Sequence, residues 1–137
     1  MALVDQGESD ILDIIFRGAA APSSLYLGLG TGSVPGDTAT LADVVEPSGG
    51  SYARVAVARN STVWPTLALV SGDYRVDSDT LTFPAPTGNW GTITYVFLCT
   101  VASGTSGRLW TVTALSPSLA VNNGDPAPSF KLRNALS

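Results

Sequence analysis

Three segments of this 137-residue chain combine a β-strand pattern with turn residues, and they restrict the fold to short strands joined by stiff corners. Residues 51–57 alternate along a strand. Residues 82–94 place two prolines and a Gly-Asn-Trp-Gly sequence between two strand patterns, and residues 122–126 form a polar turn. None of these segments holds residue types arranged for catalysis. The pattern is therefore typical of a structural β-scaffold.

The strongest strand prediction covers residues 92–101, where β-branched and aromatic residues form a nearly continuous apolar run. Such a run indicates a strand that is buried on both faces. Residues 108–115 are predicted to pair back on it as a hairpin, across the turn at 103–107. Further strands are predicted at 24–29, 52–59, 80–83, 119–121 and 129–132. Residues 67–70 fit either a strand or an apolar loop.

Short strands at about ten-residue spacing, with turn signals between them, predict an all-β fold, either an antiparallel β-sandwich or a jelly-roll-like barrel. Strands do not alternate with helices, which disfavours a parallel α/β sheet. The length suits one domain over residues 1–137, with the main strands within 52–134.

One short helix is predicted at the N-terminus, over residues 5–17, because apolar residues recur there on one helical face. Asp5 and Glu8 have the spacing of a capping box, and Gly18 is placed to end the helix. The apolar stripe needs a surface to cover it. We favour its own domain, with a neighbouring subunit as the alternative. The residues of the stripe are Ile11, Leu12, Ile15 and Phe16.

A long loop is predicted over residues 30–51, which contain five glycines and two prolines. A loop of this length in a compact domain is usually functional or disordered. An apolar island at 41–45 is placed to hold the loop against the domain or a neighbour. The acids Asp37, Asp43 and Glu46 are suited to meet basic residues on a partner. We therefore predict that the helix and this loop are the docking elements.

The charge pattern excludes several classes of function. The net charge is −4, and the seven basic residues are scattered, so no basic cluster could follow a phosphate backbone of DNA or RNA. No apolar stretch approaches the roughly 20 residues of a membrane-spanning helix. The N-terminus lacks the pattern of a signal peptide. The lone Cys99 is expected to be a buried small hydrophobe. These features fit synthesis in a reducing cytoplasm.

Catalytic and metal sites are also disfavoured, and we predict no catalytic residue, metal or cofactor. The chain has no histidine, which removes serine–histidine and cysteine–histidine nucleophiles and most zinc sites. Asp73, Asp77 and Asp79 lie close together, but a solvated loop edge is a better interpretation than a carboxylate pair or a calcium site. The glycine run at 28–32 lacks the following helix and the lysine of a phosphate-binding loop.

The three tryptophans, Trp64, Trp90 and Trp110, are predicted to be mainly structural, because two lie at strand ends where a ring can close a sandwich. The alternative is contact with a partner or a sugar. The full set of predicted framework residues is Tyr52, Arg54, Trp64, Phe83, Trp90, Gly91 and Asp125.

The order of these segments resembles a group of small tailed-bacteriophage virion proteins, described as head-decoration or tail-fibre-like proteins. The resemblance rests on the N-terminal helix, the strand at 25–29, and the glycine-led Tyr-Ala-Arg-Val strand at 49–55. It continues with Thr-Phe-Pro-Ala at 82–85, Trp-Gly-Thr at 90–92, and a Gly-Asp turn followed by Phe130. Residues 66–79 are longer and more apolar than the group's pattern, and the chain ends soon after Phe130.

The resemblance implies a non-enzymatic structural subunit of a tailed-phage particle, located in the virion after synthesis in the bacterial host. Among such proteins we favour a capsid decoration, or cement, protein that binds the major capsid protein across capsomers, because the chain lacks the repeats of a fibre shaft. A homo-oligomer is expected, with a trimer as one form. The alternative is a tail, baseplate or fibre-attachment protein with tail proteins as partners. A carbohydrate-binding β-sandwich that uses Trp64 or Trp90 is a third hypothesis.

Overall fold

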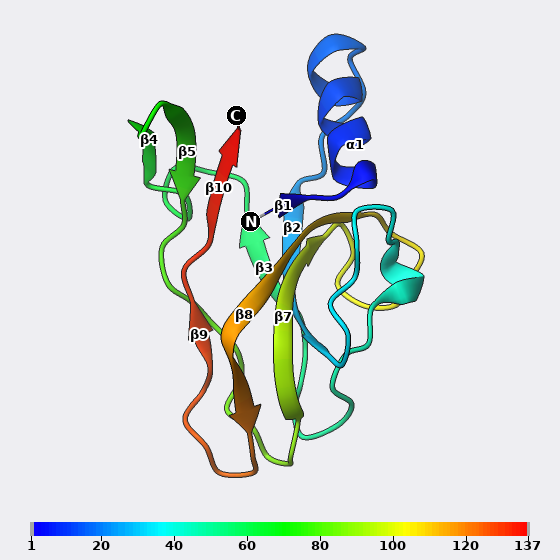
Figure 1. The fold of residues 1–137 in the computed structure, drawn as a ribbon, viewed down its shortest axis with the longest axis vertical. Helices are drawn as coiled ribbons and strands as arrows, with labels where there is room; N and C mark the ends of the chain where they lie inside the picture. The colour runs from blue at the N-terminus through cyan, green and yellow to red at the C-terminus, as the bar shows by residue number, and fades with distance from the viewer. Residues whose placement is uncertain (1, 137) are drawn as a thin grey trace.

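The computed structural model describes residues 2–136, and every strand pair in that range is antiparallel. This confirms the all-β prediction and the single α-helix at the N-terminus (Figure 1). The helix is α1 (Asp5–Phe16), and a 3-10 helix follows later at Leu41–Asp43. The strands are β1 (Ala2–Leu3), β2 (Ser24–Thr31), β3 (Val55–Ala58), β4 (Thr66–Val70), β5 (Asp73–Asp77), β6 (Leu81–Thr82), β7 (Gly91–Cys99), β8 (Leu109–Val121), β9 (Ser129–Phe130) and β10 (Arg133–Leu136).

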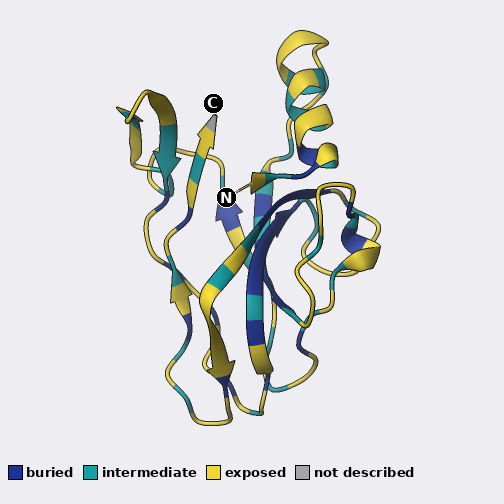
Figure 2. Ribbon diagram, in the orientation of Figure 1, coloured by how far each residue is buried: buried dark blue, intermediate teal, exposed yellow. Residues whose placement is uncertain are grey.

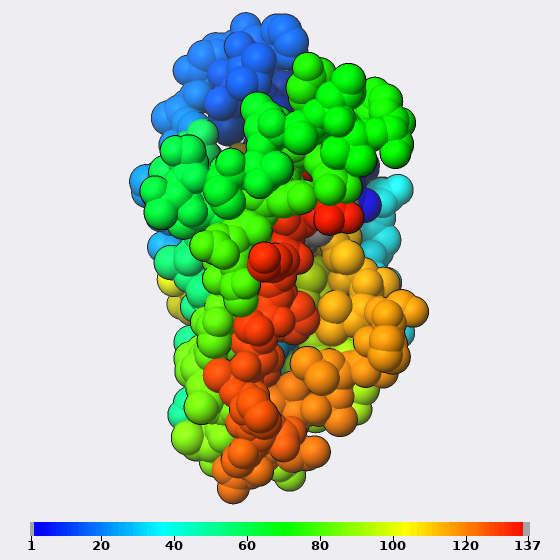
Figure 3. All heavy atoms as spheres, turned by 90° about the vertical axis from the view of Figure 1, so that its left-hand side faces the viewer, coloured from blue at the N-terminus to red at the C-terminus, as the bar shows by residue number. Residues whose placement is uncertain are grey.

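The main sheet has the strand order β1-β8-β7-β2-β3, with β7 at its centre. A second layer lies beside it, at the left of Figure 1, and consists of the sheet β10-β5-β4 and the short pair β6-β9. In the space-filling view of this side, residues 66–77 cover the end of the molecule nearest α1 (Figure 3). The arrangement is sandwich-like, as predicted.

Strand β7, at the centre of the main sheet, is buried on both faces over most of its length, which confirms the prediction for its apolar run (Figure 2). Side chains alternate between two cores, as the two-residue period of a strand requires. One core lies between the two layers and includes Leu27, Phe83, Trp90, Ile93, Val96 and Leu98. The other lies beneath the long loop and includes Val4, Leu41, Tyr95, Phe97, Cys99 and Leu109.

Two glycines of β2 make room for the aromatic residues of the second core. A Cβ at Gly28 would overlap the ring of Phe97, and a Cβ at Gly30 would overlap the ring of Tyr95. The Tyr95 hydroxyl then accepts a 3.1 Å hydrogen bond from the backbone N–H of Val45, in the long loop. The glycine run at 28–32 therefore serves packing.

Several strand boundaries differ from the predictions. The strand predicted at 52–59 is shorter, β3 (Val55–Ala58). The backbone N–H of Leu29 donates a 2.9 Å hydrogen bond to the Tyr52 hydroxyl, so it does not pair with the backbone of residues 52–54. The predicted strands at 108–115 and 119–121 are one strand, β8. The strand predicted at 129–132 is the shorter β9 (Ser129–Phe130), which pairs with β6, and the later β10, which pairs with β5, was not predicted. Finally, residues 73–77, for which the sequence favours a solvated loop edge, form strand β5.

Candidate functional site

The first turn of α1 is fixed on strand β8. The backbone N–H of Val4 donates a 2.9 Å hydrogen bond to the carbonyl of Trp110, and the side-chain oxygen of Gln6 accepts one of 3.0 Å from the backbone of Leu109. Gly7 lies against the backbone of Trp110, where a Cβ would overlap the carbonyl. The predicted cap at Asp5 is not formed, because Val4 is the N-cap residue and makes no side-chain cap. Backbone contacts with β8 hold this end instead.

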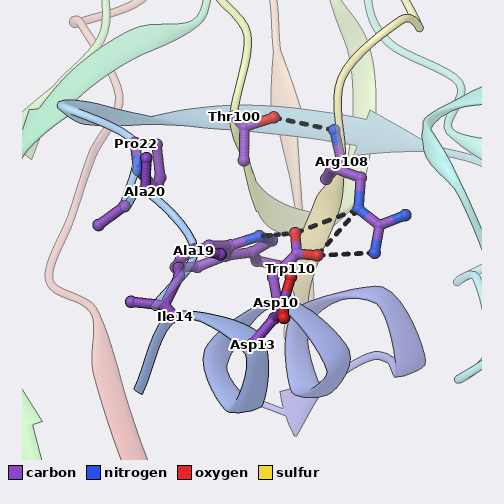
Figure 4. Close-up of a pocket in the computed structure, with 10 residues that line it drawn as sticks. Asp10, Asp13, Ile14, Ala19, Ala20, Pro22, Thr100, Arg108 and Trp110 are labelled. Atoms are coloured by element: carbon purple, nitrogen blue, oxygen red, sulfur yellow. Dashed lines mark hydrogen bonds and ion pairs between the residues drawn. The ribbon is translucent and has the colours of Figure 1, made fainter. Parts of the chain in front are cut away.

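Asp10 extends this attachment one turn further along α1 (Figure 4). Its carboxylate accepts hydrogen bonds from Nε and Nη2 of Arg108, the shortest at 2.7 Å, and one of 2.8 Å from Nε1 of Trp110. The hydrogen bonds from Arg108 lower the pKa of Asp10, so the carboxylate stays charged. The cluster lines a shallow pocket of about 380 Å³ between α1 and residues 19–22. Sequence reasoning missed it, because 98 residues separate Asp10 from Arg108.

The outer face of α1 is apolar and has no cover in residues 2–136. The exposed fractions of Leu12, Ile15 and Phe16 are 56%, 67% and 78%, and Figure 2 shows the distal turns of the helix as mostly exposed. Ile11 and Ile14 pack against the first core instead. The predicted stripe is thus divided: Ile11 turns inward, and the other three residues face solvent. The favoured hypothesis, that the stripe packs on its own domain, is wrong for these three. We call Leu12, Ile15 and Phe16 the exposed stripe.

A buried arginine ties the long loop to the sheet. Arg54 has 3% of its side chain exposed and donates to both carboxylate oxygens of Glu46, at 2.9 and 2.7 Å. It also donates to the carbonyls of Val101 and Gly104. The Tyr52 hydroxyl donates to the same Glu46 carboxylate, at 2.7 Å. Glu46, a predicted docking acid, therefore has internal partners.

The other two predicted docking acids are exposed. Asp43 ends the 3-10 helix, and its carboxylate accepts the backbone N–H of Thr40 at 2.8 Å. The side chain of Asp37 faces solvent, while its carbonyl accepts the backbone N–H of Asp5 at 2.9 Å, which joins the loop to the start of α1. Leu41 is 1% exposed in the second core, so the predicted apolar island does hold the loop against the sheet.

A groove of about 690 Å³ lies between α1 and the outer sheet β10-β5-β4. Its floor contains Trp110 and Leu98 from the main sheet, and Ile11 contributes the wall on the side of α1. Trp64, a predicted framework residue, also lines it and is partly buried. The remaining lining residues, which come mostly from the outer layer and the turn before it, include Arg59, Asn60, Pro65, Leu67, Tyr74, Val76 and Asn134.

The predicted framework residues Tyr52, Phe83 and Trp90 form an aromatic cluster in the first core. The Tyr52 and Trp90 rings meet edge to face, with centroids 5.4 Å apart, and Trp90 donates from Nε1 to the carbonyl of Gly50 at 2.8 Å. Gly91 has a φ of 85° where β7 begins, and a carboxylate oxygen of Asp125 accepts the backbone N–H of Asn122 at 2.7 Å. These residues shape the corners of the fold.

The polar residues considered for chemistry have structural surroundings. Cys99 is fully buried, and burial raises the pKa of its thiol. Asp77 forms ion pairs with Arg75 and Arg133, at 3.4 and 3.2 Å. Within residues 2–136 no group of three or more acidic, histidine or cysteine side chains is placed to hold a metal ion. No helix in that range has the length and apolar character needed to cross a membrane.

Comparison with known protein families matches residues 2–135 to the family described as podophage GP4 fiber I protein gp80. The match covers nearly the whole chain, so the chain belongs to this family. A search of curated proteins found no match. Family membership confirms the resemblance to tailed-phage virion structural proteins, and it places the protein in the virion.

Proposed function

We propose that this member of the fibre I family is a structural subunit of a fibre at the phage tail, and that it is not an enzyme. The observation that carries the proposal is the family match over residues 2–135, whose description names a fiber protein. The proposed partners are tail proteins and further copies of the same chain. No nucleic acid, membrane or cofactor has a part in this function.

The architecture supports a subunit that acts through its surfaces. A main sheet with a buried core on each side provides a stiff body. Helix α1, which carries the exposed stripe, is attached by its first turn at one end of that body (Figure 1). Exposed apolar stripes of this kind mark interaction sites, because solvation of Leu, Ile and Phe is unfavourable. We therefore assign the exposed stripe to contact with a neighbouring subunit.

The long loop is the second proposed contact, made with a tail protein. Its backbone is fixed by the Arg54–Glu46 pair and by Leu41, so little ordering entropy is lost when it binds. Asp37 and Asp43 are exposed on it and offer negative charge to a basic partner surface. Contacts of this type weaken as salt shortens the range of electrostatic attraction.

The capsid cement hypothesis is the competing location on the particle. It rests on the small size of the chain and on the absence of shaft-like repeats, and a fibre-attachment subunit has both properties too. The family description favours the fibre. In the carbohydrate-binding hypothesis, Trp90 cannot stack on a sugar, because this residue is 3% exposed and its Nε1 donates a hydrogen bond to the carbonyl of Gly50.

Counting and locating the protein on purified particles tests the proposal. Quantitative mass spectrometry should find a small fixed number of copies, far below that of the major capsid protein. Gold-labelled antibodies against the chain should mark the tail in electron micrographs. Labels spread over the head, at a copy number comparable to that of the capsid protein, would instead establish the cement function.

The proposed loop contact is tested by rebinding the purified chain to particles that lack it. Asp37→Asn should weaken binding several-fold at low salt and lose this effect at high salt. Asp73→Asn is the matched control, because Asp73 is an exposed acid of the outer sheet. Equal binding by both variants would remove Asp37 from the contact. Deletion of residues 1–17 is unsuitable, since it removes β1 and the buried Val4.

A further inference from the structure

Two uncovered apolar surfaces lie at the same end of the molecule, on either side of one groove. One is the exposed stripe, and the other is the face of β4 and β5 that lines the groove. Helix α1 and these two strands lie at the same end in Figures 1 and 3. We propose that the groove receives the exposed stripe of a second copy of the chain. This deepens the proposed function by naming the two mating surfaces, although the contact itself does not depend on attachment to a tail.

Cross-strand pairing collects the apolar residues of the outer sheet on one face. Leu67 is opposite Val76, and Leu69 is opposite Tyr74, and directly opposed residues in an antiparallel pair lie on the same face. Leu67, Tyr74 and Val76 line the groove, which identifies this face as its outer wall. The exposed fractions of Leu67, Leu69 and Tyr74 are 73%, 59% and 62%. Large side chains this exposed leave the wall uncovered in a single chain.

The residues of the exposed stripe have the spacing found in helices that bind in a groove. Leu12, Ile15 and Phe16 are spaced i, i+3 and i+4, so they project from one side over a single turn. Recognition of this kind inserts such anchor residues into an apolar groove. The volume of the groove, about 690 Å³, falls in the range of pockets that bury most of a ligand's surface. The apolar character of the stripe therefore matches that of the groove.

Charge complementarity selects α1 as the occupant. The helix contains four acids and no basic residue, whereas the residues that line the groove include Arg59 and Arg75 and no acid. Arg75 is already paired with Asp77, so Arg59 is the groove cation that the argument uses. The four acids are Asp5, Glu8, Asp10 and Asp13. Asp10 and Asp13 have arginine partners on their own chain, Arg108 and Arg17. Asp5 and Glu8 are exposed beside the stripe and can approach Arg59 of another copy.

The occupant must come from a second chain. The first turn of α1 is fixed on β8 through Gly7 and Gln6, and its Ile11 already forms one wall of the groove of its own chain. A helix that forms a wall of the groove cannot also be the helix that binds inside it. A contact that joins a stripe on one copy to a groove on the next is heterologous, and such contacts repeat until they close a ring or extend a filament.

The test is the mass of the purified full-length chain in solution, measured by light scattering and sedimentation equilibrium. The parent should be an oligomer. Phe16→Asp on the stripe and Leu67→Asp on the groove wall should each raise the dissociation constant by about 30-fold or more. Val34→Asp is the control, because Val34 is an exposed apolar residue on the long loop. Cooperative β-sheet melts must show that all three variants fold.

Mixing the two variants distinguishes this contact from other modes of association. Phe16→Asp retains an intact groove, and Leu67→Asp retains an intact stripe, so the mixture should form one good contact and stop at a 1:1 pair. A parent that has the mass of one chain would overturn the proposal. Folded variants that remain oligomeric, or a mixture that remains monomeric, would also overturn it. None of these results bears on whether the protein lies at the tail.

Discussion

The carboxylate of Glu46 and the guanidinium of Arg54 form a two-pronged hydrogen-bonded pair, at 2.9 and 2.7 Å, in which the arginine side chain is almost fully buried. A buried charge that loses its partner is strongly destabilising. The pair therefore makes the attachment of the long loop a determinant of the stability of the whole sheet.

Glu46→Ala should lower the free energy of unfolding by about 3 kcal/mol, because it leaves the charge of Arg54 uncompensated. The double variant Glu46→Ala/Arg54→Met should recover part of the loss, since it removes the stranded charge. Urea unfolding measures both values. Asp37→Ala, on the same loop but exposed, should change stability by less than about 0.5 kcal/mol. A double variant no better than the single one would show that the charge is not the cause.

Trp90→Ala should destabilise the fold by about 3–5 kcal/mol, because the ring is 3% exposed and contacts Tyr52 and Phe83. Trp90→Phe keeps a ring but loses the hydrogen bond to Gly50, and it should cost less. Urea melts of the two variants separate packing from hydrogen bonding. A cost below about 1 kcal/mol for the alanine variant would be incompatible with a buried ring.

Gly7→Ala should destabilise the chain by about 1–3 kcal/mol, even though alanine favours helices more than glycine does. The added methyl group would overlap the carbonyl of Trp110, so α1 must shift away from β8. Gly36→Ala is the matched control, since a Cβ there meets no atom within 4 Å. Near-ultraviolet circular dichroism, to which Trp110 contributes, together with thermal melts, reports the shift. Equal melting temperatures for the two variants would contradict the close contact.

The Asp10–Arg108 pair should give stability a defined pH dependence. The pKa of Asp10 is lowered in the folded state, so its contribution is complete above about pH 4 and is lost as the pH falls through the folded value. Asp10→Asn should cost about 1 kcal/mol at neutral pH, a modest value because Arg108 is partly exposed. The difference from the parent should shrink in urea melts at acidic pH. A difference that is constant with pH would assign the effect to packing alone.

The sequence predicted best where one local signal determined the outcome. The apolar run of β7 predicted a strand with two buried faces, and Gly18, with a φ of 77°, ends α1 as expected. Strand β8 is one strand, although two separate strands are predicted at 108–115 and 119–121. The ladder pairs Tyr95 with Ala114 and Ile93 with Leu119, so Pro117 lies in a bulge where no ladder hydrogen bond is needed.

Other features depend on residues far apart in the chain, and local patterns do not contain them. The period of α1 could not show which of its apolar residues would face the sheet, because Gly7 and Asp10 fix that rotation through contacts with β8. Likewise, the sequence around Asp73 and Asp77 indicates a solvated loop, whereas in the structure this segment is a strand that pairs with β4 and β10. The acids in β5 are accommodated because Asp77 meets two arginines.

The attachment of α1 to β8 also imposes an order on folding during synthesis. The ribosome makes the helix first, yet the residues that hold it, Arg108 to Trp110, emerge about a hundred residues later. A nascent or truncated chain that ends before β8 therefore lacks the β8 contacts of the helix. Only a chain completed through β8 presents Leu12, Ile15 and Phe16 in a fixed orientation. If the exposed stripe is the proposed contact, an incomplete copy would lack this surface in its binding orientation.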